Sequence, residues 1–273
     1  MKHRLAVLFL CCCAGVSVAS AQIKSVFVED LTWEEVRDAL RAGMTTAIYF
    51  AGSTEQNGPH LAIGKHNFIA RYVAQRIAET LGNALVYPIM PFAPTGDALK
   101  KTGHMRFPGS VSIAERLFGS VARDVALSAL MAGFQYVVLM GDHGNGQTAL
   151  QKAAAELDAA WASKGARVFY IGDVYFKAHD QVQIYLQQQQ LPTGRHASVS
   201  DTSEILFIDR EHKWFRPDKV AAADRPNGVD GDPRPASGQL GQMIIETKIT
   251  SAVTQIRALI GQLSPLTPPR PTR

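Results

Sequence analysis

Cysteine is confined to one short stretch of this chain. Cys11, Cys12 and Cys13 are the only three among 273 residues. The rest of the chain can therefore form no disulfide and no thiolate metal site. Any metal bound beyond residue 13 must be held by His, Asp or Glu.

Long apolar runs are also scarce. The only candidate is at the N-terminus, where a basic start (Lys2, Arg4) precedes an apolar stretch and an Ala-x-Ala pattern ending at Ala21. This order is typical of a secretory signal peptide, and the stretch is short for a membrane span. The alternative is that this segment is not cleaved and anchors the protein in a membrane. We predict a signal peptide over 1–21, and a mature protein that is exported to the periplasm or secreted and not held in a membrane.

A basic cluster is the third missing feature. The formal charge of +4 falls to +2 once Lys2 and Arg4 are removed. Neither this balance nor the distribution of Lys and Arg favours nucleic-acid binding. With 46% hydrophobic and 19% charged residues, the composition is that of a globular protein able to bury a large core.

Continuous apolar runs alternate with segments of helical periodicity. Such runs are typical of strands buried on both faces of a parallel sheet. We predict a single α/β domain over 22–264, a three-layer α/β/α fold with a mostly parallel sheet, and a disordered Pro-rich tail over 265–273. The expected strands are 45–51, 84–90, 135–141 and 166–172, and the expected helices are 32–43, 67–81, 112–133 and 147–163.

Two polar loops follow expected strands, and a third polar cluster lies further along the chain. Because ligands bind beyond the carboxyl ends of parallel strands, we expect the two loops to meet. Taken singly, a loop histidine is more often a surface or hydrogen-bonding residue than a ligand; the convergence of several polar groups favours a site. The loops contain Glu55, Asn57, His60 and His66, then Asp142, His143 and Asn145, and the cluster contains His196, Asp201 and Glu204.

Five segments in order resemble the creatininase (creatinine amidohydrolase) family. They are "GSTEQNGPHLAIGKHN", "GHMRFPGSVSI", "GDHGNG", "HASVSDTS" and "GDPRPASGQLG", and they cover most of residues 45–260. The resemblance implies a hydrolase in which two divalent metals activate a water that attacks a cyclic amide or another C–N bond. It also implies a homo-oligomer. By position, Glu55 matches the family's first metal-binding Glu, His143 the His of the second loop, and His196 a histidine used for proton transfer.

Other positions depart from the family pattern. Asn57 replaces a ligand His, and His66 replaces the Asp that bridges the two metals. Asn145 stands where creatininase itself has Glu, Asp142 replaces a Gly, and Asp201 shortens a Glu. An imidazole offers one nitrogen to one metal, and amide oxygens are poor zinc ligands, so the second metal loses its bridge.

One metal position keeps a full ligand set. Glu55, His66 and His143 supply two imidazoles and a carboxylate, the usual set for catalytic zinc. We predict one Zn²⁺ per chain, with Fe or Mn as alternatives. His196 and Asp201 are the predicted catalytic residues. Asp142, Asn57, Asn145 and His60 are candidates for further ligands or for supporting contacts. For Asp142 the supporting contact would be orientation of His143, and His104 is a candidate for substrate contact.

The expected function is metal-dependent hydrolysis of a non-peptide C–N bond in a small molecule. Two alternatives remain open. The altered ligand positions are compatible with a relative that binds a small molecule without hydrolysing it. The two-His, one-carboxylate set is also compatible with a mononuclear iron enzyme of non-hydrolytic chemistry.

Overall fold

The computed structural model describes residues 24–263. The expected signal peptide (1–21) and Pro-rich tail (265–273) lie outside the described residues.

The centre of the fold is a four-stranded sheet in which every pair is parallel. The strand order is β2-β1-β3-β4. Ala51 at the end of β1 lies opposite Gly141 at the end of β3, so the segments that follow both strands leave the same edge of the sheet. The strands are β1 (Thr46–Ala51), β2 (Ala84–Val86), β3 (Tyr136–Gly141) and β4 (Arg167–Tyr170).

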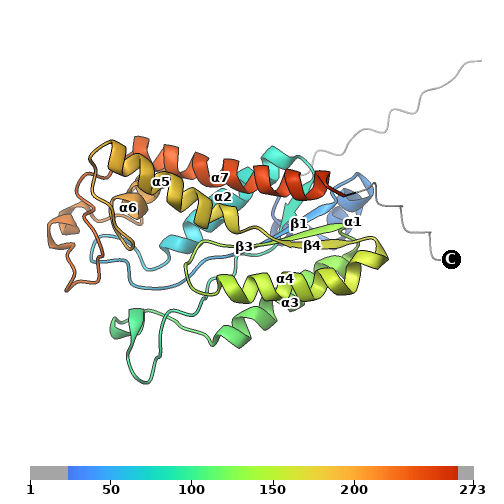
Figure 1. Cartoon of the computed structure of the whole chain (residues 1–273), viewed down its shortest axis with the longest axis horizontal. Coiled ribbons are helices and arrows are strands. Elements are labelled where there is room, and N and C mark those ends of the chain that lie inside the picture. The colour runs from blue at the N-terminus through green and yellow to red at the C-terminus, as the bar shows by residue number, and fades with distance from the viewer. Residues whose placement is uncertain (1–23, 264–273) are drawn as a thin grey trace, which may run out of the picture.

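Helices cover both faces of this sheet (Figure 1). Ile48 and Phe50 of β1 pack in a core with α2 and α7, whereas Ala47 and Tyr49 pack on the other face with α3 and α4. Alternate side chains of β1 therefore pack into two separate cores, one on each face of the sheet. This confirms the three-layer α/β/α fold with a parallel sheet. The α-helices are α1 (Trp33–Arg41), α2 (Lys65–Leu81), α3 (Glu115–Ala132), α4 (Gln147–Trp161), α5 (Phe176–Gln188), α6 (Val199–Ile208) and α7 (Gly238–Gly261), and the 3₁₀ turns are η1 (Val28–Asp30), η2 (Gly103–Arg106), η3 (Ala162–Lys164), η4 (Gly172–Val174) and η5 (Pro217–Ala222).

Several element boundaries differ from the sequence prediction, and β4, for example, ends at Tyr170 and not at Gly172. β2 ends at Val86 because Pro88, which has no N–H, interrupts the run before Met90 pairs again with Ala51. α3 begins at Glu115, three residues late, because Ser112 is paired with the segment at Ala93. α2 begins at Lys65, so the His next to it lies in the first helical turn and not in the preceding loop.

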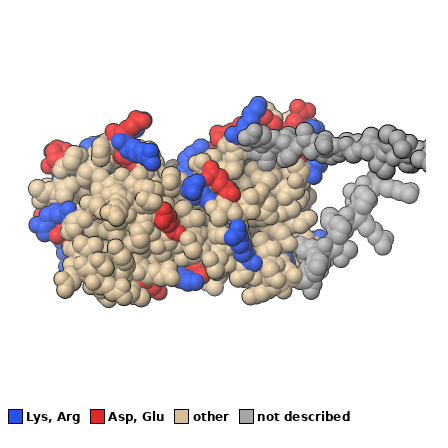
Figure 2. All heavy atoms as spheres, turned by 90° about the horizontal axis from the view of Figure 1, so that it is seen from above, with Lys and Arg blue, Asp and Glu red and all other residues tan. Residues whose placement is uncertain are grey.

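On the surface seen from above in Figure 2, basic and acidic side chains are interspersed. Among the helices of residues 24–263, none combines the length and apolar character needed to cross a bilayer.

Candidate metal centre

Glu55 occupies the centre of the site. It follows β1 by four residues and its side chain is fully buried. The close approach of α2 depends on Gly52, because a Cβ there would lie 2.2 Å from Asn67 Oδ1. Ser53 Oγ donates to Glu55 Oε2 at 2.9 Å. Burial opposes ionisation of Glu55, but hydrogen bonds from His143 and His66 prevail and hold its pKa well below the usual range.

His66 and His143 contact the two oxygens of this carboxylate. His66 Nε2 lies 3.1 Å from Glu55 Oε1, and His143 Nε2 lies 2.8 Å from Oε2. The rings meet edge to face with centroids 5.3 Å apart. On its far side, His143 Nδ1 accepts a hydrogen bond from the backbone N–H of Asn145 at 3.2 Å. The structure therefore brings the three predicted ligands together.

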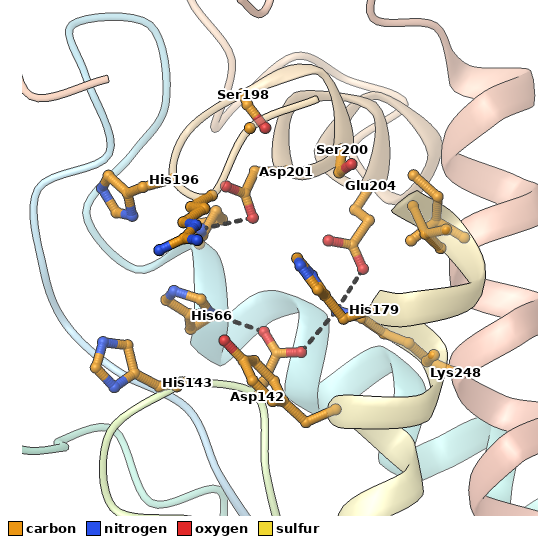
Figure 3. Close-up of a pocket in the computed structure, with 18 of the residues that line it drawn as sticks. His66, Asp142, His143, His179, His196, Ser198, Ser200, Asp201, Glu204 and Lys248 are labelled. Carbon is orange, nitrogen blue, oxygen red and sulfur yellow. Dashed lines mark hydrogen bonds and ion pairs between the residues drawn. The ribbon is translucent and has the colours of Figure 1, made fainter. Parts of the chain in front are cut away.

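Asp142 lies behind His66, not behind His143 as the sequence suggested. His66 Nδ1 donates to Asp142 Oδ2 at 2.8 Å, and Lys248 Nζ donates to Asp142 Oδ1 at 2.8 Å (Figure 3). Lys248 also lies 2.5 Å from Glu204 Oε1. Burial alone would lower the pKa of His66, but its bonds to the two carboxylates raise it. Asp142 and its cation on α7 thus fix the direction in which His66 points.

These buried charges affect one another. Burial would lower the pKa of Lys248, but Asp142 and Glu204 raise it above the ordinary value. Two carboxylates share this one ammonium, and burial raises the pKa of Glu204 to about 7 against the attraction of Lys248. Asp142, which contacts both Lys248 and His66, has a pKa below its ordinary value despite burial.

A second pair of imidazoles lies near the same carboxylate of Glu55. His104 Nε2 and His196 Nδ1 each lie 3.7 Å from Glu55 Oε1. Burial lowers the pKa of His196 to about 3 and also lowers that of His104. Both rings are therefore neutral near pH 7, and Gln56 Nε2 lies 3.1 Å from each of them.

Asp201 and His60 lie beside this group. Asp201 Oδ1 accepts from Lys65 Nζ at 2.9 Å, and its pKa is lowered despite burial because of that cation. His60 Nε2 lies 2.9 Å from Thr202 Oγ1, and burial lowers its pKa to about 4. The structure thus places His60 in a contact with α6 and not against Glu55.

Neither asparagine offers a charge to a metal. Asn57 Nδ2 donates to the backbone oxygen of Glu55 at 2.9 Å, and among the described residues its Oδ1 has no partner although it is buried. Asn145 is exposed and donates to the backbone oxygen of Pro94 at 3.0 Å.

Most of these side chains, but not Asn57 or His60, line one cavity of about 250 Å³ (Figure 3). Sequence reasoning missed several residues of its wall. Lys248 had a signal, because it falls on the apolar stripe of α7 between Ile244 and Ala252, where a cation requires a buried partner. No comparable pattern marked the others, which are Lys65, Tyr175, His179 and Arg195.

Two groups of side chains among residues 24–263 have the spacing of a metal site. They are Glu55 with His66 and His143, and Glu55 with His104 and His196, each with ligand atoms within 4.8 Å of one another. Nitrogen and carboxylate donors at this spacing suit Zn²⁺ and related divalent ions. The first group is wholly buried, and its His66 is held by a carboxylate, as metal-ligating histidines usually are.

Comparison with known proteins agrees with the resemblance read from the five segments. The family model described as "Creatininase: Creatinine amidohydrolase" matches residues 29–256. A creatinine amidohydrolase of Pseudomonas putida is 31% identical over 260 residues, which cover 86% of this chain and 97% of that protein. A mycofactocin precursor peptide peptidase of Mycobacterium ulcerans is 26% identical over 225 residues, covering 75% and 82%.

Solved structures agree on the fold. A crystal structure of creatinine amidohydrolase (creatininase) superposes with a TM-score of 0.68 at 22% identity, covering 88% of this chain and 100% of the other. A putative creatinine amidohydrolase from Bacteroides fragilis gives 0.65 at 14% identity, covering 89% and 99%.

Proposed function

Because the chain belongs to the creatininase family, we propose that it is a metal-dependent hydrolase that cleaves an amide or other C–N bond of a small, non-peptide molecule. One observation carries the proposal. Glu55 is buried between His66 and His143 at the carboxyl edge of the sheet, and it borders a cavity large enough for a small molecule.

Glu55, His66 and His143 would hold one divalent ion, with Zn²⁺ first and Fe or Mn as alternatives. Such an ion polarises a carbonyl and supplies hydroxide near neutral pH. The two nearby aspartates are engaged elsewhere, Asp142 by His66 and Lys248 and Asp201 by Lys65. Because both aspartates near Glu55 within residues 24–263 are paired in this way, one ion per chain is the proposed stoichiometry.

His196 is the proposed proton carrier. It is neutral near pH 7 and its Nδ1 faces Glu55 Oε1, so it can take a proton from water and deliver it to the leaving nitrogen. Asp201 supports this role through its charge, which opposes the lowering of the His196 pKa. His104, on the same wall, is placed to contact the substrate.

The size of the cavity supports a small substrate. A volume of about 250 Å³ lies just below the usual range of ligand pockets, and the relative of which this chain covers 97% is named for creatinine. A peptide is the second candidate, because another relative is named as a precursor peptide peptidase. We also propose export through the segment 1–21, which N-terminal sequencing of secreted protein would test by showing a chain that starts at or near Gln22.

The direct test is an assay of purified protein, stripped of metal and then loaded with Zn²⁺, Mn²⁺ or Fe²⁺. The substrates are cyclic amides including creatinine, open-chain amides and short peptides. The matched variants are Glu55→Gln in the site and Glu156→Gln on the exposed side of α4.

We expect metal-dependent amine release from a small amide in the wild type and in Glu156→Gln, and none in Glu55→Gln. Cleavage of peptides alone would replace the small-molecule proposal. Tight metal binding without any hydrolysis would favour the non-catalytic binder, and strict dependence on iron with oxidised products would favour the mononuclear iron enzyme.

A further inference from the structure

The side chain of Gln56 contacts both His104 and His196, the two imidazoles that lie 3.7 Å from Glu55 Oε1 and have ring centroids 4.5 Å apart. It is 8% exposed. Its Nε2 lies 3.1 Å from His104 Nδ1 and 3.1 Å from His196 Nε2. The amide therefore contacts a nitrogen of each ring on the edge turned away from Glu55.

The orientation of this amide is fixed by two backbone groups. Gln56 Oε1 accepts from the N–H of Gly58 at 2.8 Å, and Nε2 donates to the carbonyl oxygen of Gly228 at 3.0 Å. Turning the amide over would place N–H against N–H and oxygen against oxygen. Gly228 also packs closely, since a Cβ at that position would lie 2.4 Å from Gln56 Oε1. The NH₂ group must face the histidines.

That orientation determines which nitrogen of His104 carries the proton. An amide NH₂ only donates, so His104 Nδ1 accepts and the single proton of the neutral ring is on Nε2. Nε2 is the atom that faces Glu55. His104 thus presents an N–H to the cavity.

His196 has the same tautomer but the opposite edge turned inward. Its Nε2 lies 2.8 Å from the backbone oxygen of Gln56, which only accepts, so Nε2 carries the proton. The two amide hydrogens go to Gly228 and His104, and the 3.1 Å approach to His196 is a contact only. The atom that faces Glu55 is Nδ1, with a free lone pair.

We propose that Gln56 is a positioning residue that gives these two histidines opposite roles, with His104 a hydrogen-bond donor and His196 a proton acceptor. The side chain of Gln56 acts on His104 and its backbone oxygen acts on His196. In catalysis, which rests on the proposed function, His104 would donate to the substrate carbonyl oxygen, while His196 Nδ1 would take a proton from water and return it to the leaving nitrogen.

The test is ¹⁵N NMR of histidine-labelled, Zn²⁺-loaded protein, because ring nitrogens with and without a proton give distinct signals. His104→Asn and His196→Asn assign the peaks. In the wild type we expect both rings to be neutral with the proton on Nε2. Wild-type His104 with its proton on Nδ1 would overturn the proposal without any variant.

Gln56→Glu provides the sharper comparison. A carboxylate at this position accepts from His104 Nδ1, so His104 should gain a proton on Nδ1 while His196, held by the backbone, stays unchanged. Unchanged His104 signals would contradict the role of Gln56. If that variant does not fold, Gln56→Met serves instead. It removes the amide that keeps the proton of His104 on Nε2, so only His104, and not His196, should lose its preferred tautomer. These spectra do not depend on turnover, so loss of the proposed function and loss of this inference are distinguishable.

Discussion

Two pairs of histidines approach the same carboxylate of Glu55, and the groups behind each pair differ. His66 is held by the charged Asp142–Lys248 pair, whereas His104 is held by the neutral amide of Gln56. The pKa of His66 is raised by its carboxylate partners against burial, while burial lowers the pKa values of His104 and His196. One residue type therefore serves two purposes, and the neighbours behind each ring decide which one it serves.

Loss of metal is the largest effect that separates the two pairs. His143→Ala removes one of three ligands, so metal affinity should fall by more than the roughly 10–100-fold that loss of a supporting contact costs. His104→Ala should keep its metal. Elemental analysis after dialysis, with circular dichroism to check folding, measures both. Stoichiometric metal in His143→Ala would show that His143 is not a ligand.

Loss of activity without loss of metal is the next effect. His196→Gln should retain its ion but lower kcat by roughly 10²–10⁴-fold, the usual contribution of general acid–base catalysis. Steady-state kinetics on whichever amide the wild type cleaves, combined with metal analysis, tests this. A variant that lost metal along with activity would move His196 into the ligand set and erase the distinction between the pairs.

The support behind His66 should matter less than the ligand itself. Asp142→Asn keeps an oxygen for His66 Nδ1 but removes the charge and its attraction to Lys248, so metal affinity should fall by roughly 10–100-fold. Competition with a chelator measures the change. Asp201→Asn is the matched control, because Asp201 pairs with Lys65 and not with a proposed ligand. Equal losses in both variants would indicate a general effect of charge and not support of His66.

The number of ions provides a fourth comparison. In Asn57→His with His66→Asp, a carboxylate and an imidazole return to the positions where the family has them. Metal content should rise from one towards two ions per chain. Each single variant is a control, and two ions in the wild type would refute the one-metal proposal.

The layers of this fold could be predicted because the sequences of its strands are continuous apolar runs. Ile48, Phe50, Val138 and Met140 alternate with residues that are also buried, so the runs indicate a sheet covered on both faces. Pro88 and Ser112 show the limit of this reasoning, because the ends of β2 and α3 depend on pairing with distant segments.

The candidate site was predictable where polar residues follow strands. Glu55 and His143 follow β1 and β3, whose ends meet at one edge, so their approach could be expected. The partner of Asp142 could not be read in the same way. Neighbouring residues point in different directions, and Lys248 is 106 positions away on a helix that periodicity had not identified.

The last and smallest effect concerns the charges that hold Asp142. Burial raises the pKa of Glu204 to about 7, so the folded state binds its proton more tightly than the unfolded chain does. The stabilisation is complete below about pH 4.5 and is lost as pH rises towards 7. Glu204→Gln has no proton to lose. The free energy of unfolding of the metal-free variant, relative to wild type, should therefore increase by about 1–3 kcal/mol between pH 4.5 and 7.5.

Urea titrations across this range measure the change. Glu156→Gln is the exposed control, and its difference from wild type should stay constant. A flat difference for Glu204→Gln would mean that Lys248 keeps both carboxylates charged, so that the support behind His66 carries a net negative charge at neutral pH.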